Sequence, residues 1–424
     1  MAHDGELRVG IFTDDFYPYS GGVARSIEQQ INHLVELGHH VTLFAPRTDF
    51  DPPQACAWES LPNWYIPGTP SYLSSLVVSS GTARRIAASH QLDVVHSQNE
   101  RGSIYLTALV ARAAGLPHVH TFHSNYAGTH LTSPGQAALN SLTYLPAAGR
   151  LLRSFARRDS TSPLRTPTTP RAAEDSVHAR RDWKSLARLA RELDAFTSPA
   201  SFMKECMVDA APELADVAHV VPSGIDQAFL DVTRTRGSGG PIRFLSCSRL
   251  GAEKRVDAII SAYEQIASDD NELVIIGTGP QEAALKRQAA QVRRGTVRML
   301  GRMENTAQVA QHMADADVFV LASYHFDTQG IVLAEAAATG TPIVYCDERL
   351  TVGVGPENAV LCGRSASDLA AAMASLAADP QRRAAMSAAG RALGPSLTGK
   401  AMAQSYVDVY RQALAVAPRL RSGR

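Results

Sequence analysis

The stretch FVLASYHFDTQGIVLAEAAATGTPIVYCD, residues 319–347, decides the fold of the second half of the chain. An apolar run at 318–322 predicts a buried strand, and a short polar loop follows it. The segment Asp327 to Gly330 then opens a helix that is expected to end at Gly340. A second apolar strand begins at Ile343. This strand–loop–helix–strand order predicts a parallel sheet covered by helices.

The start of this helix is suited to binding an anion, because its first backbone N–H groups and the positive end of its dipole point in one direction. Two carboxylates eight residues apart, Asp327 and Glu335, add acceptors for hydroxyl groups. Phosphate and hydroxyl groups together describe a nucleotide sugar.

Length and composition predict two ordinary globular domains. The chain has 424 residues, of which 45% are apolar and 19% charged. Positive and negative side chains balance at 41 each, which argues against a nucleic-acid-binding protein built on bulk charge. The five cysteines fit no metal-ligand spacing, and Cys247 and Cys346 lie in strand-like runs, so we interpret them as core thiols.

The N-terminal sequence MAHDGELRVG has acidic residues where a secretion signal would be basic, and no apolar run approaches the length of a membrane span. We therefore expect a cytoplasmic protein.

Strand-like and helix-like segments alternate in both halves. The first half contains expected strands at 8–14, 39–46, 92–98 and 117–122, and the second half restarts the pattern at 241–250 and 271–280. This pattern predicts two doubly wound α/β sheets in series. The segment TRTRGSGGP (233–241) is interpreted as a flexible linker, and 160–171 as a mobile loop.

Two cations follow the first strand of the second half. Arg249 and Lys254 would lie at the carboxyl edge of the sheet, where they could share a diphosphate; the alternative is ordinary solvated surface charge. Thr278 and Gly279 belong to a glycine-rich strand end (GTGP, 277–280) on the same edge. That segment is either a simple turn or a place where a nucleotide approaches the backbone.

Gly21 and Gly22 open the first helix of the chain. They could admit a ligand close to the backbone, or could form only a tight strand-to-helix turn. They lack the GxGxxG spacing, so a dinucleotide cofactor is not indicated.

Histidines crowd the strand PHVHTFHS. Alternation places His118 and His120 on one face, with His123 at the exit of the strand and His96 on an earlier strand. A zinc site is one interpretation, but no carboxylate or cysteine completes it. We expect His118 to be a packed core residue, and His123 either to pack in the core or to belong to a site.

Two further patterns have alternative interpretations. Asp315-Ala316-Asp317 has the form of a metal-binding Asp-x-Asp motif, but it precedes its strand and is interpreted as a helix-to-strand turn. Between residues 150 and 191, eleven lysines and arginines stand against four acids. The helices there could lie on an anionic membrane surface, or could have a solvated arginine-rich face.

Several segments, in their order along the chain, resemble the retaining glycosyltransferases of family 4, which have the two-domain GT-B fold. They are GGV (21–23), TFHS (121–124), TSPASF (197–202), VPSGID (221–226), SRLGAEK (248–254), IIGTGP (275–280) and the 319–347 stretch. The resemblance implies two Rossmann-like domains facing each other across a cleft. Residues 1–226 would form an acceptor-side domain and 227–401 a nucleotide-sugar-binding domain, with a last helix (402–418) returning to the first.

The resemblance also implies roles for individual residues. Arg249 and Lys254 would bind the diphosphate, Glu335 the ribose, and Gly21-Gly22 would lie under the diphosphate. The donor sugar would be held by His123 and by Asp327, Thr328, Gln329 and Gly330, with Thr278 and Gly279 near the nucleotide. The assigned catalytic residues are His123, Arg249, Lys254 and Asp327. No metal and no cofactor is expected, and the donor would be a UDP- or GDP-linked hexose.

The family usually has glutamate where Asp327 stands, which affects the contacts of the donor sugar. The DTQG form resembles the subgroup that glycosylates diacylglycerol, so the acceptor would be a lipid or a small-molecule glycoside. Contact with the inner face of an anionic membrane is a further expectation. The alternatives are a nucleotide-sugar epimerase or phosphorylase on the same fold, and a catalytically silent binding subunit.

Overall fold

The structure is a computed structural model that describes residues 5–15, 21–47, 56–65, 74–156, 162–168, 175–237, 239–303 and 305–421. The chain divides into two compact units, one formed by 1–224 with 399–424 and the other by 225–398. The resemblance to family 4 implied junctions after residues 226 and 401.

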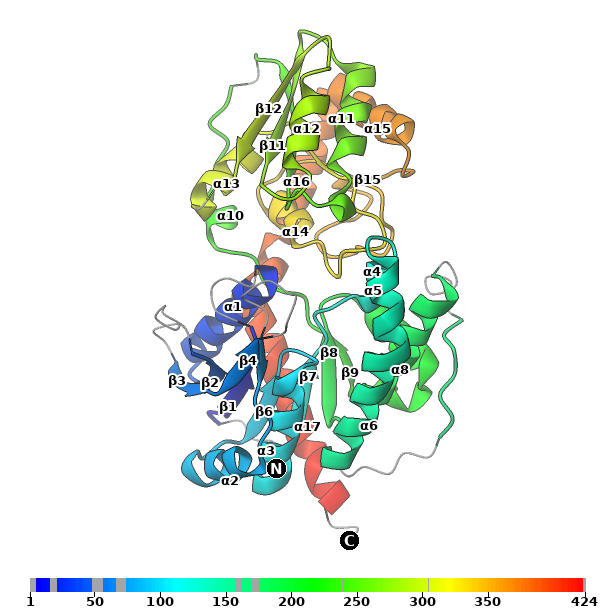
Figure 1. Cartoon of the computed structure of the whole chain (residues 1–424). Coiled ribbons are helices and arrows are strands. Elements are labelled where there is room, and N and C mark those ends of the chain that lie inside the picture. Colours follow the sequence, from blue (N-terminus) through cyan, green and yellow to red (C-terminus); the bar gives the residue numbers. More distant parts are fainter. Residues whose placement is uncertain are drawn as a thin grey trace. The chain divides into compact units, whose positions relative to one another are not determined.

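The first unit contains a seven-stranded, all-parallel sheet in the order β3-β2-β1-β6-β7-β8-β9 (Figure 1). An antiparallel pair, β4 and β5, lies between β3 and β6 in the sequence. The strands are β1 (Arg8–Phe12), β2 (His40–Pro46), β3 (Ala57–Leu61), β4 (Asn63–Tyr65), β5 (Ser74–Leu76), β6 (Val94–Ser97), β7 (His118–Thr121), β8 (Ala195–Ser198) and β9 (Ala218–Val220).

The longer helices that cover this sheet bury apolar side chains at helical spacing. In the first helix, Ile27, Ile31 and Leu34 repeat at helical spacing and are buried. The main helices are α1 (Gly22–Glu36), α2 (Ser80–Ser89), α3 (Gly102–Ala114), α4 (Tyr126–Thr129), α5 (Pro134–Leu139), α6 (Leu145–Ala156), α8 (Val177–Ala190), α9 (Ser201–Ala210) and α17 (Gly399–Arg421); a π-helical turn spans Asn140–Tyr144 and a 3₁₀ turn Pro212–Val217.

The returning C-terminal helix that the resemblance implied is α17. Its Ala403, Tyr406 and Tyr410 are buried in one core with residues of β1, β2, β6 and α1. Figure 1 shows this helix, in red, running along the sheet of the first unit.

The second unit contains a six-stranded parallel sheet in the order β12-β11-β10-β13-β14-β15. Neighbouring residues on one strand enter different cores: Leu245 faces one and Phe244 the other, as do Phe319 and Val318. The strands are β10 (Ile242–Cys247), β11 (Asn271–Ile276), β12 (Thr296–Gly301), β13 (Val318–Leu321), β14 (Ile343–Tyr345) and β15 (Ala359–Leu361).

The helices of the second unit lie on both faces of its sheet (Figure 1). They are α10 (Ala228–Asp231), α11 (Val256–Ile266), α12 (Glu282–Ala289), α13 (Thr306–Ala314), α14 (Ile331–Ala338), α15 (Ala366–Ala378) and α16 (Pro380–Leu393), with 3₁₀ turns at Ala252–Lys254 and Gly394–Leu397. The predicted fold class of two doubly wound parallel sheets is confirmed.

Each sheet has one point where the strand order reverses. It lies between β1 and β6 in the first unit and between β10 and β13 in the second. Open α/β sheets bind ligands outside the carboxyl ends of the strands at such a switch point. A ligand site is therefore expected at the loops that follow these four strands.

The interpretation of 233–241 as a flexible linker is wrong for its described residues. Arg234 and Arg236 both bind the Asp317 carboxylate, at 2.7 and 2.8 Å, and the Thr235 amide donates to Asp315. These bonds hold the segment within the second unit. Asp315-Ala316-Asp317 lies between the end of α13 at Ala314 and the start of β13 at Val318, which confirms that it is a helix-to-strand turn. Of the predicted loop at 160–171, the structure describes residues 162–168, which form neither helix nor strand, and the Arg165 amide donates to the Ala210 carbonyl at 2.9 Å.

Among the described helices, none is both long enough and apolar enough to cross a bilayer.

Candidate functional site

An ion pair lies at the switch point of the second sheet. Lys254 ends the 3₁₀ turn after β10, Asp327 lies in the loop after β13, and the Lys254 ammonium contacts Asp327 Oδ1. The Lys254 side chain is 17% exposed and the Asp327 side chain 11%. Within the described part of the chain, the other carboxylate oxygen, Asp327 Oδ2, is buried without a hydrogen-bond partner. A buried acceptor of this kind is suited to a hydroxyl group of a ligand.

The loop that carries Asp327 is held by a second carboxylate. Asp347, just after β14, accepts the His325 amide at 2.7 Å and the Arg349 amide at 3.0 Å. Burial raises the pKa of Asp347, an effect that nearby Arg349 opposes. His325 adopts φ +55°, a conformation that costs energy in a residue with a side chain, so these bonds fix a strained loop. From the sequence, Asp347 was expected only to end a strand, and its role in holding this loop was not predicted.

The predicted start of the following helix needs correction. Asp327, Thr328 and Gln329 form a loop, and α14 begins at Ile331 with Gly330 as its N-cap at φ +67°. Glycine is needed there because other residues rarely adopt a positive φ. Glu335 lies one turn into α14 and is buried, at 6% exposed.

Arg249 is positioned by a buried acid that the sequence analysis missed. Its side chain is 61% exposed, and Nη2 donates to Glu253 Oε1 at 2.6 Å. Glu253 in turn folds over Gly251, where a Cβ atom would lie 2.2 Å from Glu253 Oε2. The pattern Gly-x-Glu-Lys after the strand was the available signal.

The glycines after β11 are required by the fold, because a side chain at either position would collide with the backbone of the preceding loop. A Cβ on Gly277 would lie 1.9 Å from the Ser248 carbonyl oxygen, and one on Gly279 would lie 2.6 Å from the Leu250 carbonyl oxygen. Thr278 is exposed, and its carbonyl accepts the Leu250 amide at 2.9 Å. The turn therefore joins the loop of Arg249 to the end of the next strand.

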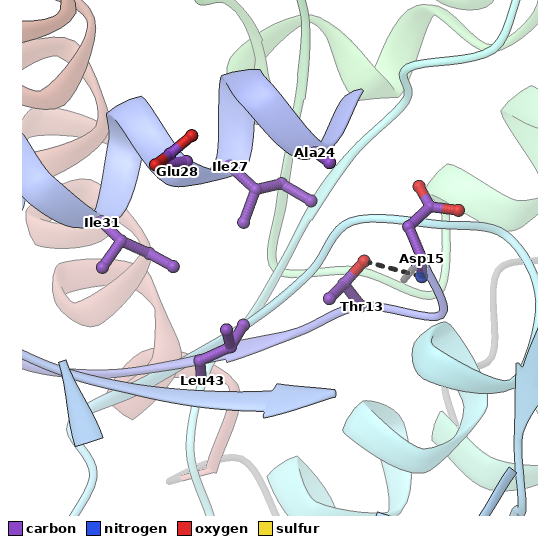
Figure 2. Close-up of a pocket in the computed structure, with 7 residues that line it drawn as sticks. All are labelled: Thr13, Asp15, Ala24, Ile27, Glu28, Ile31 and Leu43. Atoms are coloured by element: carbon purple, nitrogen blue, oxygen red, sulfur yellow. Dashed lines mark hydrogen bonds between the residues drawn. The ribbon is translucent and has the colours of Figure 1, made fainter. Parts of the chain in front are cut away.

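In the first unit, Gly21 and Gly22 begin α1 and border open space, since a Cβ on either would meet nothing within 4 Å. Gly21 has φ +72°. A small pocket lies beside this helix, with apolar side chains of α1 facing Leu43, and Thr13 and Asp15 at the end of β1 (Figure 2). Figure 2 shows the Asp15 amide bonded to Thr13 Oγ1, at 3.1 Å.

His123 follows β7 and is fixed by a chain of hydrogen bonds. Its Nε2 bonds Gln98 Oε1 at 2.7 Å, Gln98 donates to Gln30, and Gln30 donates to Tyr410 of α17. Tyr410 also bonds His96 at 2.8 Å. Burial lowers the pKa of His123 to about 3, so the imidazole is neutral at physiological pH.

His118 and His120 of β7 are both tied to the neighbouring strand β6. His118 and His120 both bond Ser97 Oγ, at 2.7 and 2.8 Å, as expected for residues on one face of a strand. His118 is buried, as predicted. In the part of the chain that the structure describes, no cluster of histidine, cysteine, aspartate or glutamate could hold a metal ion.

The switch point of the first sheet has a polar network that the sequence analysis also missed. Asn99 accepts from the Asp14 amide and donates to Asp15, both at 2.9 Å, and Arg101 donates to Asp15 at 2.6 Å. Burial raises the pKa of Asp14 to about 6, although it accepts amide hydrogen bonds from Ser103. The signals were the polar segments TDD and QNER at the ends of two expected strands.

The predicted site residues thus fall into two groups. One belongs to the second unit, at the loops after β10, β11 and β13 and on α14: Arg249, Lys254, Thr278, Gly279, Asp327, Thr328, Gln329, Gly330 and Glu335. The other belongs to the first unit: Gly21, Gly22 and His123. The structure brings Lys254 and Asp327 into direct contact.

Comparison with known families gives two matches that follow one another along the chain. Residues 20–229 match Glycosyltransferase Family 4, and residues 234–393 match Glycosyl transferases group 1. The chain is also 25% identical over 357 residues to alpha-monoglucosyldiacylglycerol synthase of Streptococcus pneumoniae, covering 80% of this chain and 70% of that protein. The protein of the same name from Acholeplasma laidlawii is 24% identical, with 80% of each chain covered.

Solved structures give the same architecture. HepE of Anabaena in complex with UDP and glucose superposes with a TM-score of 0.65 at 14% identity, covering 95% of this chain and 99% of that chain. WaaG, a glycosyltransferase of lipopolysaccharide biosynthesis, superposes with a TM-score of 0.61 at 14% identity and the same coverage. These similarities show the fold, which is GT-B. With two consecutive family matches, this fold and relatives that span most of its length, the chain belongs to glycosyltransferase family 4, near the diacylglycerol glycosyltransferases.

Proposed function

We propose that this glycosyltransferase moves a hexose from a nucleoside diphosphate sugar to the hydroxyl group of a lipid acceptor, with retention of configuration and without a metal ion. The observation that carries the proposal is the Lys254–Asp327 pair at the switch point of the second sheet, with Asp327 Oδ2 available to a sugar hydroxyl. A UDP- or GDP-linked donor fits the relatives: HepE was solved with UDP-glucose, and a Corynebacterium glutamicum relative is a GDP-mannose-dependent mannosyltransferase.

The charges of the second unit fit the chemistry of this reaction. Breaking the bond between sugar and diphosphate builds negative charge on the leaving group. Lys254, exposed Arg249 and the amides at the start of α14 would stabilise that charge where it develops. Asp327 would position the sugar, and Glu335 the ribose. In the proposed reaction the acceptor attacks from the face of the leaving group, whose phosphate oxygen takes the proton, so no carboxylate nucleophile is needed.

His123 would contact the donor sugar as a neutral hydrogen-bonding group. Burial keeps its pKa at about 3, and the bond to Gln98 fixes the ring. A neutral imidazole in a fixed orientation can form a hydrogen bond with a sugar hydroxyl. Because it carries no charge, it does not attract the diphosphate.

A lipid acceptor is supported by the surface of the first unit. Leu131, Leu139 and Leu142, which lie between α4 and α6, are 60, 61 and 56% exposed. Arg150 and Arg153 on α6 follow them. Helical segments that combine exposed leucines with arginines are typical of helices that lie on an anionic membrane. We accordingly propose peripheral contact with the inner face of the cytoplasmic membrane.

The function is tested in two stages. Thermal shifts against UDP-, GDP- and ADP-hexoses identify the donor, and transfer from that donor to diacylglycerol or glucosyldiacylglycerol in mixed micelles is then followed with and without EDTA. NMR of the product gives its anomeric configuration. Product formed without acceptor would instead indicate an epimerase. Binding without transfer or donor hydrolysis would indicate a silent subunit, and an inverted anomer would contradict retention.

A further inference from the structure

A cavity of about 260 Å³ lies between α6 and α8 in the first unit. A water molecule occupies about 30 Å³ in the liquid, so the cavity can hold a larger group together with water. Arg188 and Arg191 lie at the carboxyl end of α8, which leads into the start of β8, so the cavity lies toward the amino ends of the parallel strands, whereas the candidate site of this unit lies at their carboxyl ends. The lining residues are Gly149, Arg150, Arg153, Arg188, Arg191 and Glu192.

The two helices approach closely at one glycine. A Cβ on Gly149 would lie 2.9 Å from Cδ and 3.0 Å from Cγ of Arg188, so the aliphatic stem of Arg188 lies across this glycine. Leu152 of α6 and Leu186 of α8 are fully buried in the same core. The Arg188 stem is therefore held by packing, which places its guanidinium at the cavity.

Positive charge at the cavity exceeds negative charge. Glu192 is the one carboxylate among its lining residues, against four arginines. Arg191 pairs with Glu213. Among the residues that the structure describes, no carboxylate pairs with Arg150 or Arg188. Burial and the charges of Arg150 and Arg191 lower the pKa of Arg188.

Helix dipoles explain only part of this arrangement. Arg188 lies in the last turn of α8 and Arg191 is its C-cap, where cations are stabilised by about 0.3–1 kcal/mol. Arg150, however, lies in the middle of α6. A bound anion would offset the repulsion between these arginines, and the planar guanidinium fork matches the oxygens of a phosphate group.

We propose that this cavity binds a phosphate group, carried either by a small soluble molecule or by a lipid headgroup. The proposal does not depend on the proposed sugar transfer, because none of the lining residues is assigned a contact with the donor. Arg150 and Arg153 are shared only with the proposed membrane contact.

The test is calorimetric titration of the full chain with inorganic phosphate. The double variant R150Q/R188Q is expected to bind phosphate at the cavity about tenfold more weakly or worse, because each arginine contributes charged hydrogen bonds. R181Q changes an exposed arginine of α8 that does not line the cavity, and is expected to bind as the wild type does. R249Q/K254Q removes the predicted diphosphate contacts and is expected to bind phosphate at the cavity as the wild type does. Phosphate binding at the cavity can therefore be tested separately from donor binding.

Folding is checked by the melting temperature in phosphate-free buffer, where R150Q/R188Q is expected to match the wild type. If that variant does not fold, R150K/R188K keeps both charges and loses only the guanidinium forks, so it is expected to bind phosphate more weakly than the wild type.

Vesicles distinguish the source of the phosphate. Sedimentation compares vesicles of phosphatidylcholine alone with vesicles that also contain phosphatidic acid. If the ligand is a lipid headgroup, more wild-type protein is expected to sediment with the second kind of vesicle, and R150Q/R188Q is expected to show no such increase. Phosphate binding without this difference would indicate a soluble ligand. Wild-type phosphate affinity in folded R150Q/R188Q or R150K/R188K would overturn the proposal.

Discussion

Lys254 and Asp327 are 73 residues apart in the chain, yet their side chains form an ion pair largely shielded from solvent. They lie in the loops after β10 and β13, the two strands between which the order of the second sheet reverses. The pair therefore joins the two halves of that sheet where its ligand crevice is expected. Removing one partner leaves the other charge poorly solvated and uncompensated.

Lys254→Ala is expected to lower kcat/KM for sugar transfer roughly a hundredfold or more, because it removes a charge that stabilises the leaving diphosphate. Asp327→Asn is expected to lower the free energy of unfolding by about 1–2 kcal/mol, because Lys254 loses its partner while still partly exposed. Initial rates and urea unfolding measure the two effects.

Lys286→Ala serves as the matched control. Lys286 pairs with Glu282 on the surface of α12 and is 59% exposed, so its loss is expected to change neither rate nor stability measurably. A near-normal rate for Lys254→Ala would remove this lysine from the site.

Gly22→Ala and Gly279→Ala should separate a ligand contact from a folding requirement. A Cβ on Gly22 meets open space, so the variant is expected to fold with wild-type stability while donor affinity falls if the diphosphate approaches here. A Cβ on Gly279 would lie 2.6 to 2.8 Å from backbone atoms of Leu250, so that variant is expected to lose roughly 1–3 kcal/mol of stability.

Melting temperature and donor titration on both proteins check this pair. Unchanged donor affinity in a stable Gly22→Ala would show that the glycine serves only the turn.

Asp14 should make stability fall as the pH rises. Its native pKa of about 6 lies above the unfolded value near 4, so between these values the native state holds a proton that the unfolded state has lost. Below about pH 4, Asp14 is protonated in both states and does not lower the free energy of unfolding. Between pH 4 and pH 6 its raised pKa lowers the free energy of unfolding by roughly 1–3 kcal/mol. Urea unfolding from pH 4 to 7 is expected to show this slope in the wild type and not in Asp14→Asn. The same pH dependence in the wild type and in Asp14→Asn would show that Asp14 does not cause this slope.

The sequence allowed the fold to be predicted because the periodicity of buried strands and helices is local. The strands around Leu245 and Phe319 were expected from apolar runs, since both faces of a parallel sheet are covered. The switch points were not predicted, because strand order depends on which strands pair and not on the pattern of any one of them.

Individual site residues could be predicted from the sequence, but the contacts between them could not. Lys254 and Asp327 were each expected at the carboxyl edge of the sheet, but their contact depends on the order of β10 and β13. The supports Glu253 and Asp347 were missed because a buried carboxylate that holds a loop has no local signature. The interpretation of 233–241 as a linker was wrong because it relied on glycine and serine content. The hydrogen bonds from Arg234 and Arg236 to Asp317 join residues 83 and 81 positions apart, so composition does not indicate them.

Leu139 and Leu142 should anchor the protein to membranes if the acceptor is a lipid. Each is more than half exposed on the helical segment before α6, where burial in lipid would stabilise the bound state. The double variant L139S/L142S is expected to lower the affinity for vesicles containing anionic lipid by roughly tenfold or more, with donor binding and melting temperature unchanged. The matched control is L361S, because Leu361 is 49% exposed at the end of β15 in the other unit. An equal loss in both variants, or none in L139S/L142S, would exclude this surface as the membrane contact.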